Sequence, residues 1–147
     1  MGLLRDALRV DDRRTEIVDD CCRLLDNQVA SKKGLSGMAV KGGYKVLKAL
    51  KPGAVREAVD GLLDDFIEAM ETFHDEWKKK GDGSFGQYLN KEKDRVAESL
   101  VCVTDERAKK TRHQNLRKIY DKLRPSAVAH VQAAVPELAE LIDKYLQ

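Results

Sequence analysis

Glu71 and His74 form the Glu-x-x-His pair that this chain offers for metal chemistry. Two such pairs, projecting inward from facing helices, help to hold the metals of di-iron helix bundles. The second pair is missing here, because neither His113 nor His130 has an acid three residues earlier. A histidine at the edge of an apolar helix face is the simpler interpretation. We therefore expect no metal site and no cofactor.

The cysteines offer little for catalysis. Cys21 and Cys22 are adjacent, and Cys102 stands alone, so their spacing predicts neither a disulfide framework nor a zinc site. No nucleophile motif surrounds the cysteines or the serines, and no glycine-rich phosphate loop is present. We expect the protein not to be an enzyme.

A basic segment is followed at once by an acidic one. Residues 29–53 contain six lysines and no acid, whereas residues 54–77 contain eight acids and one arginine. One interpretation is that two antiparallel helices set these charges opposite each other as surface ion pairs. The alternative is an exposed cationic face for an anionic lipid or an acidic partner. Its candidate residues are Lys41, Lys45 and Lys48.

A second basic segment, residues 107–124, contains eight Lys or Arg residues and one acid. Clustered cations are typical of nucleic-acid binding, but these go round the helix and no known DNA-binding spacing frames them. Lys51 and Arg124 each precede a proline that suits the start of a helix. A helix N-terminus beside a cation is a candidate anion site, although helix capping explains the same residues.

Composition bounds the architecture. The 147 residues are 42% hydrophobic and 35% charged, with a net charge of +2, which favours one helix-rich domain spanning residues 1–147. The small net charge excludes global electrostatic attraction to nucleic acid or membranes, so any such binding must be local. No apolar run is long enough to span a bilayer, and the first residues are too charged for a secretory signal. We expect a cytoplasmic location.

Residues 45–55, KVLKALKPGAV, recur as residues 118–128, KIYDKLRPSAV, with five of eleven positions identical. The echo predicts an internal duplication, with repeat one at about residues 12–80 and repeat two at about 88–147. Each repeat should turn a corner at its proline. The predicted fold is all-α: a six- or seven-helix bundle built from two tandem repeats related by a pseudo-two-fold axis.

Helical periodicity predicts helices over residues 12–30, 36–51, 54–80, about 88–103, 105–124 and from 126 onward. In the second of these, the predicted core side holds Ala39, Gly43, Val46, Leu47 and Leu50. The small residues at positions 39 and 43 suggest close approach of another helix, which makes self-association a further expectation.

Three runs carry a family resemblance: VASKKGLSGMAVKGGYKVLKALKPGAVREAVDGLLDDF, VTDERAKK and YDKLRPSAVAHVQAAVPELAELI. With them the chain resembles an uncharacterised family of small helical bacterial proteins, classed as a domain of unknown function. The resemblance implies a bacterial origin and an all-helical fold, and assigns no activity. The leading hypothesis is a non-enzymatic protein-interaction module, with a homo-oligomer as one form. The alternative is a peripheral membrane or polyanion (nucleic-acid) binder that uses the lysine face.

Overall fold

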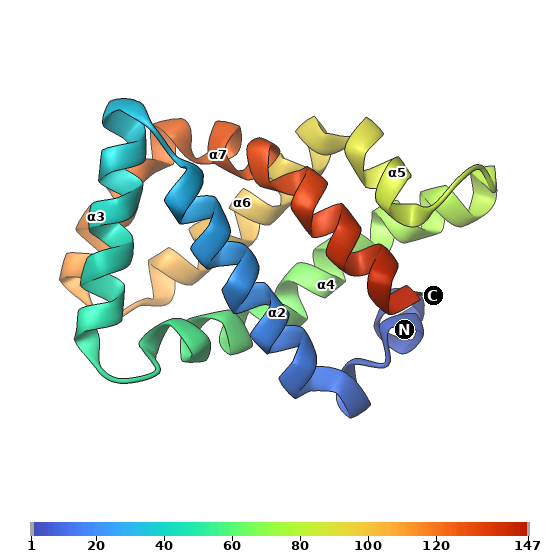
Figure 1. Cartoon of the computed structure of the whole chain (residues 1–147), viewed down its shortest axis with the longest axis horizontal. Coiled ribbons are helices and arrows are strands. Elements are labelled where there is room, and N and C mark those ends of the chain that lie inside the picture. Colours follow the sequence, from blue (N-terminus) through green and yellow to red (C-terminus); the bar gives the residue numbers. More distant parts are fainter. Residues whose placement is uncertain (1, 147) are drawn as a thin grey trace.

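Seven helices build residues 2–146, the part of the chain that the computed structural model describes, and no strand lies among those residues (Figure 1). The helices are α1 (Leu3–Leu8), α2 (Val10–Ser31), α3 (Gly34–Leu50), α4 (Ala54–Lys80), α5 (Phe85–Lys91), α6 (Lys93–Lys110) and α7 (Gln114–Leu146). The predicted all-α class and helix number are confirmed.

The long helix α4 has the bounds that its pattern predicts. Its core face buries Leu63, Ile67, Met70 and Phe73 at the three- and four-residue spacings of a helical stripe. The helix stops at Gly81, whose φ of 71° lies in the left-handed region that glycine adopts without strain. α4 contacts every other helix of the described chain except α7, and α7 contacts every other helix except α4, so these two long helices together organise the bundle.

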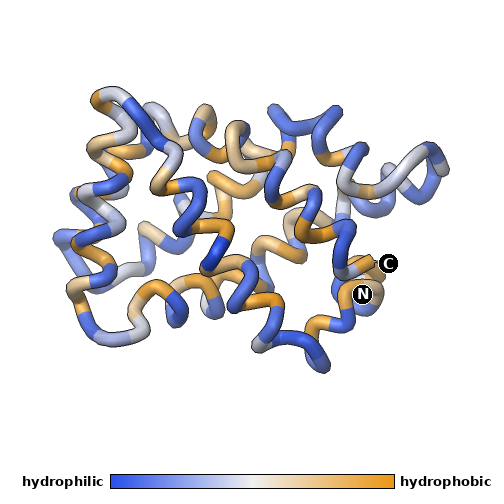
Figure 2. The backbone as a smooth tube through the Cα atoms, in the orientation of Figure 1, coloured by the Kyte–Doolittle hydropathy of each residue, from blue (hydrophilic) through white to orange (hydrophobic). Residues whose placement is uncertain are grey.

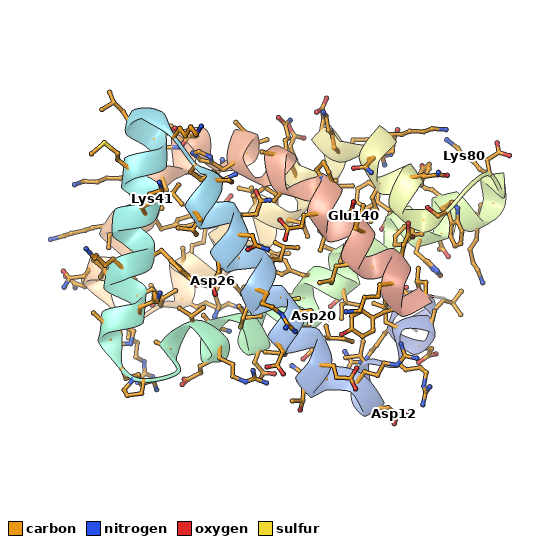
Figure 3. The ribbon with its side chains drawn as sticks, viewed as in Figure 1. Asp12, Asp20, Asp26, Lys41, Lys80 and Glu140 are labelled. Carbon is orange, nitrogen blue, oxygen red and sulfur yellow. The ribbon has the colours of Figure 1, made fainter. Side chains whose placement is uncertain are left out.

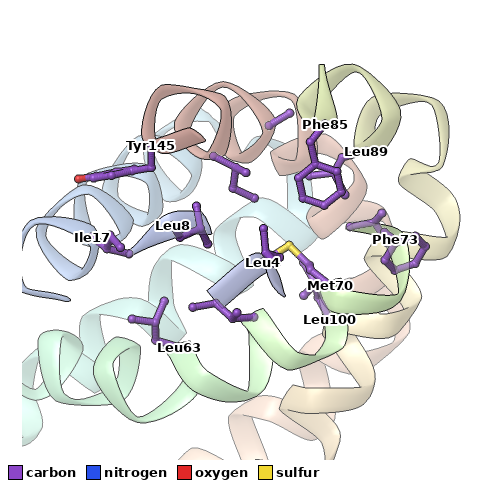
Figure 4. Close-up of a cluster of buried hydrophobic side chains, with 14 of the residues drawn as sticks. Leu4, Leu8, Ile17, Leu63, Met70, Phe73, Phe85, Leu89, Leu100 and Tyr145 are labelled. Atoms are coloured by element: carbon purple, nitrogen blue, oxygen red, sulfur yellow. The ribbon is translucent and has the colours of Figure 1, made fainter. Parts of the chain in front are cut away.

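Most of the core lies where α1 and α5 pack between α4 and the last part of α7. Figure 4 shows Leu4, Met70, Phe73, Phe85 and Leu89 gathered in this cluster. α5 is fixed in place by hydrogen bonds from its first turn: the Ser84 hydroxyl and the Gly86 amide both donate to Asp143 of α7. We call this part of the molecule the packed end.

The first proline corner is confirmed. Lys51 is extended (φ −171°), as expected for a residue that precedes proline, and Gly53 adopts a φ of 79°. Only glycine enters this left-handed region freely, so the Lys51–Pro52–Gly53 sequence itself favours the change of direction from α3 to α4.

The second predicted corner is wrong. α7 continues as one helix through Pro125 and Pro136. Figure 1 shows its first part behind α3 and its last part crossing the front of the molecule, so it changes direction along its length without a break. The position that corresponds to Gly53 is Ser126, which lacks glycine's access to positive φ. The two halves therefore do not share the predicted corner, and the duplication with its pseudo-two-fold axis is not confirmed.

The predicted boundary between the helices at residues 88–103 and 105–124 was also misplaced. The pattern predicts a break near Thr104, but α6 runs through it to Lys110 and the break falls at residues 111–113. The Thr104 hydroxyl donates to the carbonyl oxygen of Val101 within the helix, so the threonine need not mark an end.

Candidate functional site

The outer side of α3 exposes large apolar side chains. Leu35 is 89% and Met38 70% exposed, and Val46 and Leu50 are also open to solvent. At 100° per residue these side chains, with Ala39, Gly42 and Ala49 between them, lie within about 60° of one line along the helix. We call this set the α3 stripe. Figure 2 shows the hydrophobic residues recurring along α3, which lies at one edge of the molecule.

The inner side of α3 is not the one that the sequence suggests. Gly37 is buried and Val40, Gly43, Tyr44 and Leu47 are half-buried. Three of the five predicted core residues, Ala39, Val46 and Leu50, face solvent instead. This part of the prediction was wrong because apolar residues occupy most of the circumference of α3, so periodicity alone does not select the side that packs.

Two interactions hold the inner side of α3 against its neighbours. A Cβ on Gly43 would lie 2.7 Å from the Ile119 side chain of α7, so only a glycine allows the two helices to approach this closely. The Tyr44 hydroxyl donates to Asp26 of α2, and burial together with this carboxylate raises the tyrosine pKa. The close approach predicted for Gly43 therefore occurs within the chain, which leaves Gly43 unavailable to a second copy.

Lys41, Lys45 and Lys48 lie together on a second side of α3, within about 60° of one another and beside the α3 stripe. All three are exposed, and none forms a salt bridge with any residue in the described range 2–146. Lys48 places its ammonium 5.1 Å from the centroid of the Tyr44 ring. In Figure 3, where Lys41 is labelled, the side chains at this edge project away from the body of the protein.

Several acids of α4 pair with residues other than these three lysines. Arg14 of α2 forms ion pairs with Asp60 and Asp64, and Arg5 of α1 pairs with Asp64 as well. The guanidinium of Arg14, and then that of Arg5, holds the pKa of Asp64 below its usual range. The prediction that the lysines of α3 pair with the acids of α4 is therefore wrong for Lys41, Lys45 and Lys48.

The two corner cations are paired within the chain. The Lys51 ammonium lies 2.9 Å from a Glu57 carboxylate oxygen, and Nε of Arg124 donates to Asp105 at 2.8 Å. Arg124 stands inside α7 rather than at a helix end. Arg124 therefore has no helix N-terminus beside it, and neither Lys51 nor Arg124 carries a charge that is free to bind an anion.

The second basic segment lies beside α3. Ile119 and Leu123 of α7 pack against Gly43, and the exposed Lys118 and Lys122 precede each of them by one residue. The lysines of α3 and the cations at the start of α7 therefore share one end of the molecule, an association that the sequence separation of about 75 residues conceals.

A large apolar pocket that is partly open to solvent lies against the inner side of α3, and no motif in the sequence indicated it. It has a volume of about 600 Å³ and is bounded by α2, α3, α4, α6 and α7. Its apolar walls include Leu25, Val29, Leu47, Leu62, Ile119 and Leu123. Four cations also line it: Lys51, Arg107, Lys110 and Arg117. We call it the α3 cavity.

Among the residues considered for metal or nucleophilic chemistry, Glu71 and His74 take part in hydrogen bonding and packing. Both carboxylate oxygens of Glu71 accept backbone N–H groups at the start of α1, from Leu4 and Arg5. His74 is buried edge-on against Phe85, and this desolvation lowers its pKa. Burial raises the pKa of the Cys21 thiol to about 11, which keeps it protonated and unreactive at neutral pH.

Residues 4–146 match the family of unknown function DUF6918, and the chain belongs to this family. Comparison with curated proteins and with solved structures found no match. Within residues 2–146, no helix combines the length and the apolar character needed to cross a membrane.

Proposed function

We propose that this chain is a non-enzymatic binding protein that docks through the outer face of α3 onto an anionic lipid membrane. One observation carries the proposal: the exposed α3 stripe runs beside three lysines that have no acidic partner in the described chain. A helix that lies in the membrane interface combines two features: an apolar side that enters the acyl region and cations that contact the lipid head groups.

The energetics fit reversible binding. Full burial of a Leu or Met side chain contributes about 1.5–3 kcal/mol, and Leu35 and Met38 are the two most exposed large apolar residues described. Each lysine near an anionic membrane adds about 1 kcal/mol. Tyr44 faces inward, so the stripe has no aromatic anchor and the expected attachment is weak and sensitive to salt.

Co-sedimentation with vesicles tests the proposal. The full chain is mixed with vesicles of phosphatidylcholine plus phosphatidylglycerol, and separately with phosphatidylcholine alone, at low and at physiological salt. We expect binding to the anionic vesicles, strongest at low salt. Absence of binding at low salt would overturn membrane docking, because electrostatic attraction is greatest there.

Matched variants locate the surface. Combined Lys41→Gln, Lys45→Gln and Lys48→Gln should abolish vesicle binding, whereas Lys78→Gln, Lys79→Gln and Lys80→Gln remove the same charge from the far end of α4 and should not. Leu35→Ser should weaken binding, while Leu3→Ser, at another exposed leucine, should leave it unchanged. Equal losses from both lysine sets would mean that only net charge matters.

A protein partner is the second candidate for the same face. The observation that favours it is the pair of small residues Ala39 and Gly42 in the middle of the α3 stripe, where a helix backbone can approach closely. Sedimentation equilibrium of the pure chain tests the case of a second copy, and a mobility shift with duplex DNA tests nucleic acid. A dimer that Gly42→Leu abolishes would favour self-association over lipid.

A further inference from the structure

The α3 cavity lies on the other side of α3 from the docking face, shares only Leu50 with the α3 stripe, and has the size of a small-molecule site. Its volume of about 600 Å³ falls within the range that such sites occupy. Most of its walls are aliphatic: they come from α2, α3, α4 and α7 and include Leu25, Val40, Leu47, Leu62 and Leu123. Tyr44 and Tyr120 are the tyrosines in the lining, and each already uses its hydroxyl on an aspartate.

Charge in the lining is almost all positive. The acid that lines the cavity among the described residues is Glu57, and it pairs with Lys51. Arg107, Lys110 and Arg117 have no ion-pair partner in residues 2–146. An apolar cavity of this kind therefore opens beside three uncompensated cations.

Arg107 has a prepared position. A Cβ on Gly61 of α4 would lie 2.7 Å from Nη2 of Arg107 and 3.4 Å from its Cζ. The missing side chain thus leaves room for the guanidinium to lie against α4, across the space between α6 and α4. In this position the exposed guanidinium presents donors that match the two oxygens of a carboxylate or phosphate.

We infer that the α3 cavity binds a single-chain amphiphile with an anionic head group. The alkyl chain lies among the aliphatic walls, and Arg107, with Lys110 and Arg117 near it, binds the head group. A carboxylate and a phosphate monoester satisfy the same guanidinium, so the head group can come from a free fatty acid or from a monoacyl phospholipid. An alkyl chain fits better than a fused aromatic system because the walls supply few aromatic faces for stacking.

Calorimetric titration of the full chain, without vesicles, tests the inference. Palmitate and monoacylglycerol phosphate represent the two sources, and hexadecanol supplies the same chain length without charge. We expect one molecule bound per chain, with hexadecanol at least about tenfold weaker. Shortening the fatty acid should weaken binding about fourfold per methylene removed from the cavity. Equal affinity for hexadecanol and palmitate would overturn the role of the cations.

Two substitutions test the two halves of the site. Ala58→Phe fills the cavity from α4 and should abolish binding, whereas Ala49→Phe adds the same side chain to the outer side of α3 and should leave binding unchanged. Arg107→Gln should weaken the binding of palmitate about tenfold or more. Arg112→Gln, on an exposed arginine outside the lining, should leave palmitate binding unchanged. Because Arg107 is exposed, its variant remains informative if Ala58→Phe does not fold.

Gly61→Ala keeps every charge but displaces the Arg107 guanidinium, so it should also weaken the binding of palmitate. The variant that lacks Lys41, Lys45 and Lys48 separates this inference from membrane docking. It should no longer bind vesicles but should bind palmitate as the wild type does. If neither palmitate nor monoacylglycerol phosphate binds the wild-type chain, the inference is wrong and membrane docking is unaffected.

Discussion

The packed end and the α3 end bury their helices to very different extents. α5 has 7 residues, and four of them, Phe85, Gly86, Tyr88 and Leu89, are buried. α3 has 17 residues, and its one buried residue is Gly37. The difference separates two tasks: the packed end supplies the stability of the fold, while the α3 end leaves apolar surface open on its outer side and a cavity on its inner side.

Leu89→Ala should give the largest effect and tests the packed end. Leu89 is fully buried in the core cluster, so truncation should lower the free energy of unfolding by about 2–5 kcal/mol. Denaturant unfolding followed by circular dichroism measures it. The matched change at the other end is Leu50→Ala, on an exposed leucine, and a loss of similar size there would break the comparison.

Asp20→Asn should have the next largest effect on stability. The Lys144 ammonium, the Tyr145 hydroxyl and Arg23 hydrogen-bond this buried carboxylate and lower its pKa from an ordinary 3.8 to about 2. That shift corresponds to about 2 kcal/mol of stability. Because the folded-state pKa is depressed, this stability is present above about pH 4 and is lost as the pH falls toward 2.

Unfolding of the wild type and the Asp20→Asn variant across the acid range measures this contribution. The variant should be less stable at neutral pH and should lose less stability on acidification. Parallel pH profiles for the two proteins would show that the Asp20 carboxylate does not couple the middle of α2 to the end of α7.

Gly53→Ala tests the boundary of the α3 end. Its φ of 79° costs an alanine about 1 kcal/mol, so unfolding should become easier by about that amount. Ser126→Gly, at the corresponding position inside α7, should cost about 0.5–1 kcal/mol for the opposite reason, since glycine weakens a helix interior. A stabilising effect of Ser126→Gly would indicate that α7 prefers to break there.

Leu35→Ser should have the smallest effect on stability, within about 0.5 kcal/mol, because the side chain is 89% exposed. Thermal unfolding of the free chain measures this change. A loss as large as that of Leu89→Ala would mean that the α3 stripe is covered in solution by another part of the molecule or by a second copy.

Sequence reasoning succeeded where one local signal decided the structure. The bounds of α4 follow from a wide apolar stripe that ends at Gly81, and the first corner follows from Pro52 with Gly53. It failed at Pro125, because a matching proline was taken to imply a matching corner although the glycine was absent. The proline alone was a weaker signal than the helical propensity around it.

The candidate site was predicted in part for a similar reason. The lysines of α3 are visible as a local run, and their exposure confirms that they lie on a solvent-facing side. The pairing of Asp60 and Asp64 with Arg5 and Arg14, which come from the N-terminal helices, could not be read from that local run. The α3 cavity requires five helices to be placed together, and Arg107 gains its position from Gly61, 46 residues away. No short-range pattern encodes either fact.

The continuity of α7 has a structural consequence. Its first turns, with Leu116 and Ile119, form a wall of the cavity, and its last turns, with Ile142 and Tyr145, are set in the core. Between them stand Pro125 and Pro136, each of which removes one backbone hydrogen bond from the helix. Sharp bends in helices occur at prolines, so these two positions account for the change of direction along α7 that Figure 1 shows. A single bent helix therefore spans the molecule, with one end in the wall of the cavity and the other in the core.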